Sequence, residues 1–262
     1  MKKLRISVLL AAGLTGVMAA GPGQAQDASK VTACMRANIP ETIKVKTLEI
    51  VARDRSGGER MLKGRLFGSR EGGKLRTMMR IEAPSDLAGA SYLVRESDKG
   101  GDEMYMFLPA LNKVRRITGA SVDGQLWGTD ITYSDVKQMQ NAFSGASATL
   151  EAPTVIEKRK VDVVSFKPRK DDASRYSRIR AYVDQATCVA LKVEFLEGDG
   201  VRKELVSTAA SLAQSGKHWY VSEMLIRDVK DLTQTRIKIL GVEAGDKLSG
   251  RYFNPQSFYL GS

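Results

Sequence analysis

Histidine is almost absent from this chain, since His218 is the only one among 262 residues. A single histidine excludes metal sites built from several histidines, and a Ser-His-Asp triad would need His218 itself. His218 stands beside Trp219, just after a Gly-Lys pair, where a turn histidine is far more common than a catalytic base. The chain also has no G-x-S-x-G elbow and no C-x-x-C pair. We therefore expect no catalytic residue, metal or cofactor, although no spacing rules out a pair of acidic residues.

Long apolar runs are equally scarce, and the one present lies at the N-terminus. Three cations, Lys2, Lys3 and Arg5, precede the apolar run Ile6–Ala20, and Gly23-Gln24-Ala25 offers the small residues that signal peptidase needs. The run is shorter than the roughly 20 residues that span a bilayer. These features predict a signal peptide over residues 1–25, cleavage after Ala25 and a periplasmic protein. A retained membrane anchor is the alternative.

Cysteine is limited to Cys34 and Cys188. An even count in an oxidising compartment favours one disulfide between them. Val31-Thr32-Ala33-Cys34 also looks like a lipoprotein cleavage box, but Pro22, Asp27 and Lys30 separate it from the apolar run. Lipidation of Cys34 is therefore the alternative to the disulfide.

Residues 26–262 show no Pro/Gly/Ser-rich linker and no repeat, which indicates a single domain. Without the signal peptide, 38 cationic side chains face 30 acidic ones, a net charge of +8. A basic exported protein suits anionic partners such as lipid headgroups better than nucleic acid. The alternative is an ordinary solvated surface with alternating charges.

Period-two alternation dominates the chain from Thr42 onward, with Gly-rich turns between the runs. Residues 28–38 and Asp135–Ser144 are predicted helices. From these alternating segments we expect about eleven strands. The thirteen segments that show the pattern are Thr42–Asp54, Arg60–Arg70, Leu75–Ala83, Ser91–Glu96, Glu103–Leu108, Lys113–Thr118, Val155–Lys167, Arg175–Val183, Val189–Leu196, Lys203–Thr208, Trp219–Arg227, Thr235–Leu240 and Phe258–Leu260. Short antiparallel strands of this kind predict a barrel, a half-barrel or a sandwich.

Some of these strands are apolar on both faces, most clearly Met104–Leu108 and, less so, Thr77–Met79. A sheet with one wet face should alternate more cleanly, so this one is expected to be covered on both sides. Methionine suits a site that accepts varied apolar shapes. Periodicity alone leaves two interpretations open, ordinary core packing and a ligand cavity.

A long ordered block of the chain resembles the outer-membrane lipoprotein-sorting family, in the LolA-like superfamily of periplasmic lipid carriers. The segments that carry the resemblance are Arg80–Pro84, Gly89–Leu93, Met106–Leu111, Lys113–Ile117 and Gly128–Asp135, followed by Arg180–Asp184 and Leu191–Phe195. The resemblance implies an incomplete antiparallel β-barrel, a half-barrel whose helices form a lid over bound acyl chains. It also implies service to export systems of the inner membrane. The N-terminal segment around Cys34 departs from the family pattern, and the cargo stays open among lipoprotein, phospholipid, sterol-like lipid and polyketide-like pigment.

Period-two faces select the residues of a candidate lipid site. The apolar side chains expected on one concave face are Leu66, Met79, Ile81, Met104, Met106, Leu108, Leu191, Val193, Phe195 and Leu225. Trp127 and Tyr133, near the second helix, are candidates for the lid contact. Arg115 and Arg116 follow an apolar strand, so we place them at the cavity rim to meet a headgroup or an acidic partner. The alternative for this pair is a solvated strand end or a structural salt bridge.

These observations predict a periplasmic carrier of lipid or lipoprotein acyl chains that is not an enzyme. Its expected partners are an inner-membrane transporter, an outer-membrane acceptor, or both. The main alternative is an interaction or stress-sensing module of the envelope that carries no lipid. A lipid-modifying enzyme is the third possibility.

Overall fold

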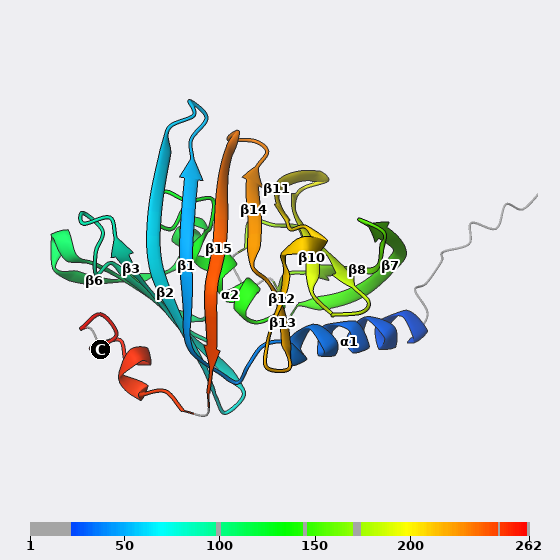
Figure 1. Cartoon of the computed structure of the whole chain (residues 1–262), viewed down its shortest axis with the longest axis horizontal. Coiled ribbons are helices and arrows are strands. Elements are labelled where there is room, and N and C mark those ends of the chain that lie inside the picture. Colours follow the sequence, from blue (N-terminus) through cyan, green and yellow to red (C-terminus); the bar gives the residue numbers. More distant parts are fainter. Residues whose placement is uncertain (1–21, 98–100, 144–145, 170–173, 246, 261–262) are drawn as a thin grey trace, which may run out of the picture.

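The protein is built around one large antiparallel sheet (Figure 1). A computed structural model describes residues 22–97, 101–143, 146–169, 174–245 and 247–260. The sheet has 13 strands and does not close into a barrel, and two α-helices accompany it. The predicted class, mainly β with an incomplete barrel, is confirmed, since 54% of the chain is strand and 15% is helix.

The strands follow a meander that is interrupted once. The strands are β1 (Thr42–Arg53), β2 (Glu59–Glu71), β3 (Lys74–Ala83), β4 (Ser91–Arg95), β5 (Glu103–Leu108), β6 (Lys113–Ile117), β7 (Ser147–Ile156), β8 (Arg159–Lys167), β9 (Arg178–Asp184), β10 (Ala190–Glu197), β11 (Gly200–Val206), β12 (Leu212–Ser215), β13 (His218–Val221), β14 (Glu223–Asp228) and β15 (Thr233–Ala244). Their order in the sheet is β6-β5-β4-β3-β2-β1-β15-β14-β11-β10-β9-β8-β7, with β12 and β13 as a separate hairpin. The two halves of the chain therefore meet where β1 pairs with β15.

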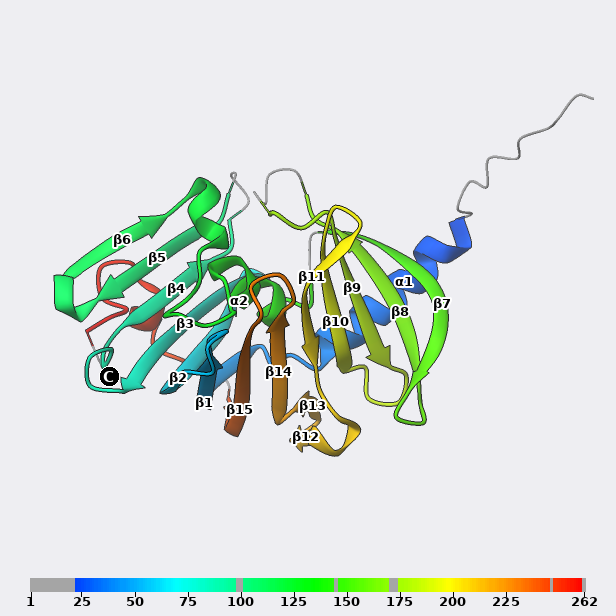
Figure 2. The same ribbon diagram turned by 90° about the horizontal axis from the view of Figure 1, so that it is seen from above.

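The connection from β6 to β7 joins the two outer edges of the sheet, so it has to cross the sheet. Its described part, residues 118–143, is called the crossing segment below, and it contains α2 (Tyr133–Gln140). The sheet curves around α2, which places the crossing segment on its concave face (Figure 2). The other helix, α1 (Pro22–Ala37), runs along β7 and β8.

The main core lies between the concave face and these two covers. Side chains of the crossing segment such as Leu126, Ile131 and Phe143 pack in one cluster with inward side chains of both halves of the sheet. Met35 near the end of α1 belongs to the same cluster. The sheet is thus covered on its concave face along most of its width.

A second cluster covers the outer face of β2 to β5. The C-terminal segment supplies Phe253 and Phe258, which pack on Phe67, Met78 and Phe107 from the strands. This segment explains why the strands around Met78 and Phe107 are apolar on both faces: Met79 and Met106 face the main core, and their neighbours face the C-terminal segment.

Three expected elements differ in the structure. The run Trp219–Arg227 is two strands, β13 and β14, in different sheets, and Phe258–Leu260 is a turn anchored by Phe258 instead of a strand. Three residues are too few for periodicity to tell a strand from an anchored turn. The run Val155–Lys167 is not one strand: it begins in the last two residues of β7 and continues as β8, with a turn at Glu157 and Lys158 between them.

The predicted disulfide is confirmed. Cys34 and Cys188 are bonded, with their Cα atoms 5.7 Å apart. The lipidation alternative for Cys34 is wrong in this structure, because a sulfur atom in a disulfide cannot also carry a lipid thioether. The predicted helix over residues 28–38 is also confirmed, as part of α1. Residues 1–21 of the predicted signal peptide lie outside the described residues, so cleavage after Ala25 stays a prediction.

Candidate functional site

A cavity of about 230 Å³ lies between the centre of the sheet and its covers. Its floor comes from β1, β2, β3, β10, β11, β14 and β15, including Leu48, Leu66 and Val193. Its walls come from the end of α1, the C-terminal part of α2, the β9–β10 turn and the β12–β13 hairpin. An apolar cavity of about 150 Å³ is already large enough to hold benzene, so this one has room for a larger apolar group.

The lining is apolar with few exceptions. Among the described residues that line the cavity, none is Asp or Glu, and the ionisable side chains are Lys46, His218 and Tyr220. A register irregularity in β1 between Ile43 and Lys46 brings both side chains to the concave face although they are three residues apart. Burial among apolar groups lowers the pKa of the Lys46 ammonium to about 8.

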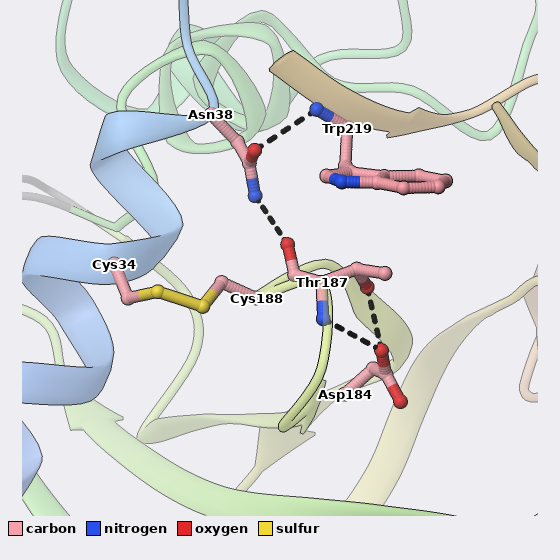
Figure 3. Close-up of a disulfide and its surroundings, with 6 residues drawn as sticks. All are labelled: Cys34, Asn38, Asp184, Thr187, Cys188 and Trp219. Atoms are coloured by element: carbon pink, nitrogen blue, oxygen red, sulfur yellow. Dashed lines mark hydrogen bonds between the residues drawn. A yellow bond between two sulfur atoms is a disulfide. The ribbon is translucent and has the colours of Figure 1, made fainter. Parts of the chain in front are cut away.

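The α1 wall of the cavity is fastened at its C-terminal end (Figure 3). The disulfide joins Cys34 to the turn before β10, and the Asn38 side chain donates to the Thr187 carbonyl oxygen at 2.6 Å and accepts from the Trp219 amide at 2.9 Å. Asp184 orients this turn by accepting from the Thr187 amide and hydroxyl at 2.9 and 2.6 Å. Burial opposes ionisation of Asp184, but bonds from Arg159 and Thr187 outweigh it and hold the pKa of this carboxyl below its usual range.

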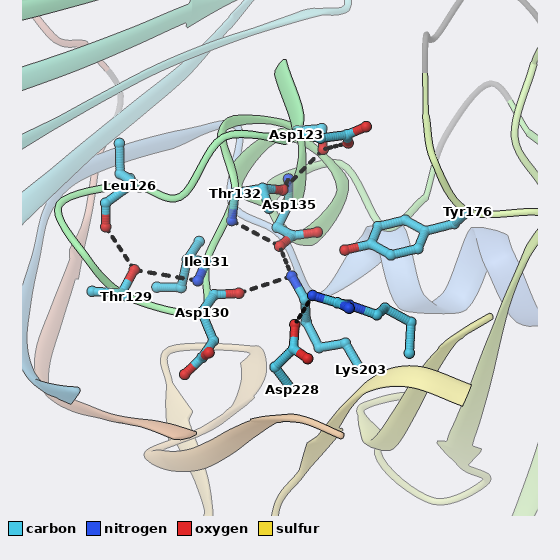
Figure 4. Close-up of polar contacts among 12 residues, drawn as sticks. Asp123, Leu126, Thr129, Asp130, Ile131, Thr132, Asp135, Tyr176, Lys203 and Asp228 are labelled. Atoms are coloured by element: carbon cyan, nitrogen blue, oxygen red, sulfur yellow. Dashed lines mark hydrogen bonds and ion pairs between the residues drawn. The ribbon is translucent and has the colours of Figure 1, made fainter. Parts of the chain in front are cut away.

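The crossing segment is fastened by the Gly128–Asp135 motif (Figure 4). Asp130 accepts from the hydroxyls of Thr233 and Thr235 on β15, the latter at 2.7 Å. Thr132 and Asp135 form a capping box at the start of α2. The Lys203 ammonium, 3% exposed on β11, lies 2.5 Å from Asp135 and donates to the Asp130 carbonyl oxygen at 2.8 Å. The motif that carries the family resemblance therefore holds the lid on the sheet.

The other side of the crossing segment is tied to the first half of the sheet. The Tyr92 hydroxyl donates to the Tyr133 carbonyl oxygen at 2.8 Å, and the two rings lie 5.2 Å apart. Burial raises the pKa of Tyr92 well above its usual value, so its hydroxyl keeps the proton that it donates. Asn141, just after α2, accepts from Arg70 at 3.0 Å and donates to Glu96 at 3.1 Å.

Most residues of the predicted concave face lie together in the main core. The cluster contains Leu66, Met79, Ile81, Met104, Met106, Val193 and Phe195, with Leu108 packed against it. Three of them, Leu66, Met79 and Val193, line the cavity. The other five belong to the core outside the cavity. Phe195, for example, packs on Tyr176 with ring centroids 5.0 Å apart.

Leu191 and Leu225 do not join this face. Leu191 packs in a separate cluster with Val161 and Val221, because the pairing of β10 with β9 is irregular between Ala190 and Lys192. On β14 the main cluster takes Met224 and Ile226, so Leu225 between them faces the other side. Both side chains therefore lie on the opposite face of their strand from the one predicted, which is the effect of a one-residue error in register.

The aromatic and arginine candidates also lie away from the cavity lining. Trp127 and Tyr133 are in the crossing segment, but they pack in the main core at the start of α2 and are not among the lining residues. Arg115 and Arg116 are exposed on β6, the edge strand of the sheet. Since β6 contributes no lining residue, the predicted place of this pair at the cavity rim is wrong.

Sequence reasoning missed Lys46 and the hairpin side chains around Trp219. Lys46 is in phase with Leu48 and Ile50, so period two alone would have placed it on the inner face. No local signal marks the hairpin as a wall. The Nδ1 atom of His218 lies 3.1 Å from the Ala37 carbonyl oxygen at the end of α1. Within the described ranges, no three His, Cys, Asp or Glu side chains gather to hold a metal ion.

Among the helices of the described ranges, none has the length and apolarity needed to cross a bilayer. In this architecture an open sheet curves around a fastened cover, with an apolar cavity beneath it. Solved structures share this architecture. A domain named as an outer-membrane lipoprotein-sorting protein, from Vibrio parahaemolyticus, aligns with a TM-score of 0.81 and 20% identity over 90% of this chain and 99% of that one.

Two further structures agree. A DUF1329 family protein from Desulfovibrio piger has a TM-score of 0.81 and 19% identity over 88% of this chain and 97% of that one. A LolA superfamily protein from Nitrosomonas europaea has a TM-score of 0.69 and 14% identity over 87% and 97%. The fold is therefore LolA-like, and the resemblance inferred from the sequence is confirmed.

One family model, described as "Uncharacterized protein", matches residues 73–259, which is more than half of the chain. The protein belongs to this family. No curated protein matches the sequence.

Proposed function

We propose that this protein is a periplasmic carrier that binds the acyl chain of a lipid or lipoprotein in its cavity and passes it between membrane-bound partners. The observation that carries the proposal is the apolar cavity of about 230 Å³, bounded by the sheet, α1 and α2. Burying each methylene of a tail is worth about 0.8 kcal/mol, so a short length of chain supplies useful affinity.

Three features support a carrier rather than an enzyme or a sensing module. The lining offers apolar contact, and no acidic pair stands among its described residues. The lid is tied to β11 by the buried Lys203 contacts, and the α1 wall is tied to the turn before β10 by the disulfide and by Asn38, so both covers are held beside the cavity. The architecture is shared with a domain named for lipoprotein sorting. The inner-membrane exporter and outer-membrane acceptor remain the proposed partners.

The first test asks what the protein carries. Protein recovered from the periplasm without detergent, beginning at Gln26, is extracted with organic solvent, and the extract is measured by mass spectrometry. Lipid at near-stoichiometric amounts supports the carrier. An extract with no lipid contradicts it and favours the non-carrier module.

The second test fills the cavity. Val193 lines it from β10, so Val193→Phe should block binding of an environment-sensitive fatty-acid probe with little loss of stability. In a core without a cavity the same change overpacks and costs about 1–3 kcal/mol. Leu225→Phe is the matched control, because Leu225 faces away from the main core and should leave probe binding unchanged. Unchanged probe fluorescence in Val193→Phe, or strong destabilisation, would contradict the lipid site.

A further inference from the structure

Lys46 is a cation inside an otherwise apolar cavity. It lies on β1 beside Leu66 of β2 and Val242 of β15, two residues from Leu48 on the same face. Its ammonium has no hydrogen bond and no ion pair with any described residue, and burial is the one cause that shifts its pKa. Lys46 is partly exposed, but its stem and ammonium line an apolar cavity, and a charge held there without a partner is costly, so this position calls for an explanation.

The other inward lysine shows how the same fold treats a buried cation that serves structure. Lys203 is met by the Asp135 carboxylate and the Asp130 carbonyl oxygen. On the same strand, the exposed Lys44 lies 3.9 Å from the Glu243 carboxylate. Lys46 differs from both, because the described cavity lining around it supplies no carboxylate. No described residue of the lining therefore offers Lys46 an anion.

The protonation state of Lys46 suits that role. With a pKa of about 8, the ammonium is mostly charged at pH 7. The floor from β2, β3, β10, β11, β14 and β15 and the walls from α1 and α2 add no charged side chain to the lining. His218 and Tyr220 of the hairpin are the other titratable groups there. An acid group that enters the cavity would meet one cation and no repelling carboxylate.

We propose that the cavity takes a single apolar tail that ends in an acid group, and that Lys46 Nζ pairs with this acid. The inference rests on the proposed carrier function and narrows its cargo. The volume of about 230 Å³ suits one short tail and not several full acyl chains. The acid is a carboxylate or a phosphate, which a free fatty acid or a lipid headgroup supplies.

The experiment compares three probes with one tail length on the full secreted chain: decanoate, decyl phosphate and 1-decanol. Binding is measured by isothermal titration calorimetry for the wild type and Lys46→Met. Lys44→Met is the matched control, since it removes an exposed lysine from the same strand. Thermal melting confirms that each variant is folded.

We expect the wild type to bind at least one acid probe about tenfold or more tighter than 1-decanol. Lys46→Met should abolish this preference and leave 1-decanol binding intact, while Lys44→Met changes neither. A preference for decanoate identifies a fatty acid as the source of the acid, and a preference for decyl phosphate identifies a phosphorylated lipid. Equal binding of all three probes, unaffected by Lys46→Met, would overturn the inference and leave the carrier standing. Binding of none of them would overturn both.

A second measurement uses the wild type and tests the pairing even if Lys46→Met does not fold. Wild-type affinity for the preferred acid should fall as the pH rises from 7 to 10, because Lys46 loses its proton, whereas affinity for 1-decanol should stay constant. His218→Gln should keep this profile, which separates Lys46 from the other nitrogen base in the lining. A flat profile for the acid would contradict the pairing.

Discussion

At the scale of single residues, the concave face holds two lysines in opposite electrostatic situations. Lys203 is buried but neutralised, with the Asp135 carboxylate at 2.5 Å. Lys46 is surrounded by apolar side chains, and its pKa falls to about 8. The first lysine holds the structure together, and the second costs stability because its charge loses part of its hydration without gaining a partner among the described residues.

This contrast predicts that Lys46→Met makes the empty protein more stable. Below pH 8 the folded and unfolded states both carry the charge, so the wild type bears the desolvation cost of a partly exposed ammonium, and the variant should gain about 1–3 kcal/mol at pH 7. Between about 8 and 10.5 the unfolded state binds more protons, so the wild type gains stability as the pH rises and the advantage shrinks. Urea denaturation at pH 7 and pH 10 measures the difference.

Lys44→Met is again the control, since Lys44 is exposed and should show no such pH-dependent gain. A Lys46→Met variant that is less stable than the wild type at pH 7 would mean that the lysine already has a partner in the empty protein.

At the scale of elements, the crossing segment supplies one wall of the cavity. It has to pass from one edge of the sheet to the other, and its polar residues bind it to β15, β11 and β4 on the way. Because buried hydrogen bonds and ion pairs are directional, they set the position of α2 more narrowly than apolar packing alone would.

Lys203→Met should release the crossing segment by leaving Asp135 buried and unpaired. Removing one partner of a buried ion pair costs about 3–5 kcal/mol. Hydrogen exchange of residues 129–140 should rise together with the loss of stability. The double variant Lys203→Met/Asp135→Leu should recover part of the loss, since it buries no unpaired charge.

Arg227→Met is the control for this experiment. Arg227 pairs with Glu204 at 3.0 Å but is 49% exposed, so its loss should cost less than about 1 kcal/mol. Equal effects of Lys203→Met and Arg227→Met would show that the buried pair is no anchor.

The edge strand β6 carries a separate prediction about partners. Arg115 and Arg116 are exposed, and neither has an ion pair with a described residue. The double reversal Arg115→Glu/Arg116→Glu should therefore leave the melting temperature nearly unchanged. If this edge meets an anionic membrane or an acidic partner, transfer of a fluorescent fatty acid to anionic vesicles should slow down.

Reversal of two exposed lysines elsewhere, Lys158→Glu/Lys160→Glu, controls for net charge. Loss of folding in the arginine variant would indicate that the pair is structural. Unchanged transfer would contradict a partner contact at this edge, and the two charges would then serve only to prevent another strand from pairing with β6.

At the scale of the whole molecule, the disulfide joins the N-terminal helix to the second half of the sheet across 154 residues of sequence. Closing a loop of this length stabilises the folded state by about 4–5 kcal/mol in the chain-entropy model, which is an upper figure. It also keeps the end of α1, with Met35 and Ile39, against the cavity.

Thiol labelling of denatured, unreduced protein from the periplasm should therefore find no free cysteine. After reduction both thiols should react, and the midpoint of urea unfolding should fall. Two reactive thiols before reduction would contradict the pairing of Cys34 with Cys188 in the exported protein.

Much of this architecture could be predicted from local patterns. Period two marks β2 to β5 because successive side chains of these strands face opposite sides of the sheet, the main core on one side and solvent or the C-terminal segment on the other. The Gly128–Asp135 motif likewise pointed to the right fold, since its capping box and its contacts require specific side chains at fixed spacing.

What the sequence determined by itself is the class of fold, the disulfide partners and most of one apolar face, including Leu66, Met79 and Val193. Only the tertiary structure decided which of these side chains line a cavity. Irregular pairing in β10 moved Leu191 to another cluster, and Tyr176, from the connection between β8 and β9, packs on Phe195. A cavity is the space that distant segments leave unfilled, so its outline depends on where those segments pack and not on the pattern along any one of them.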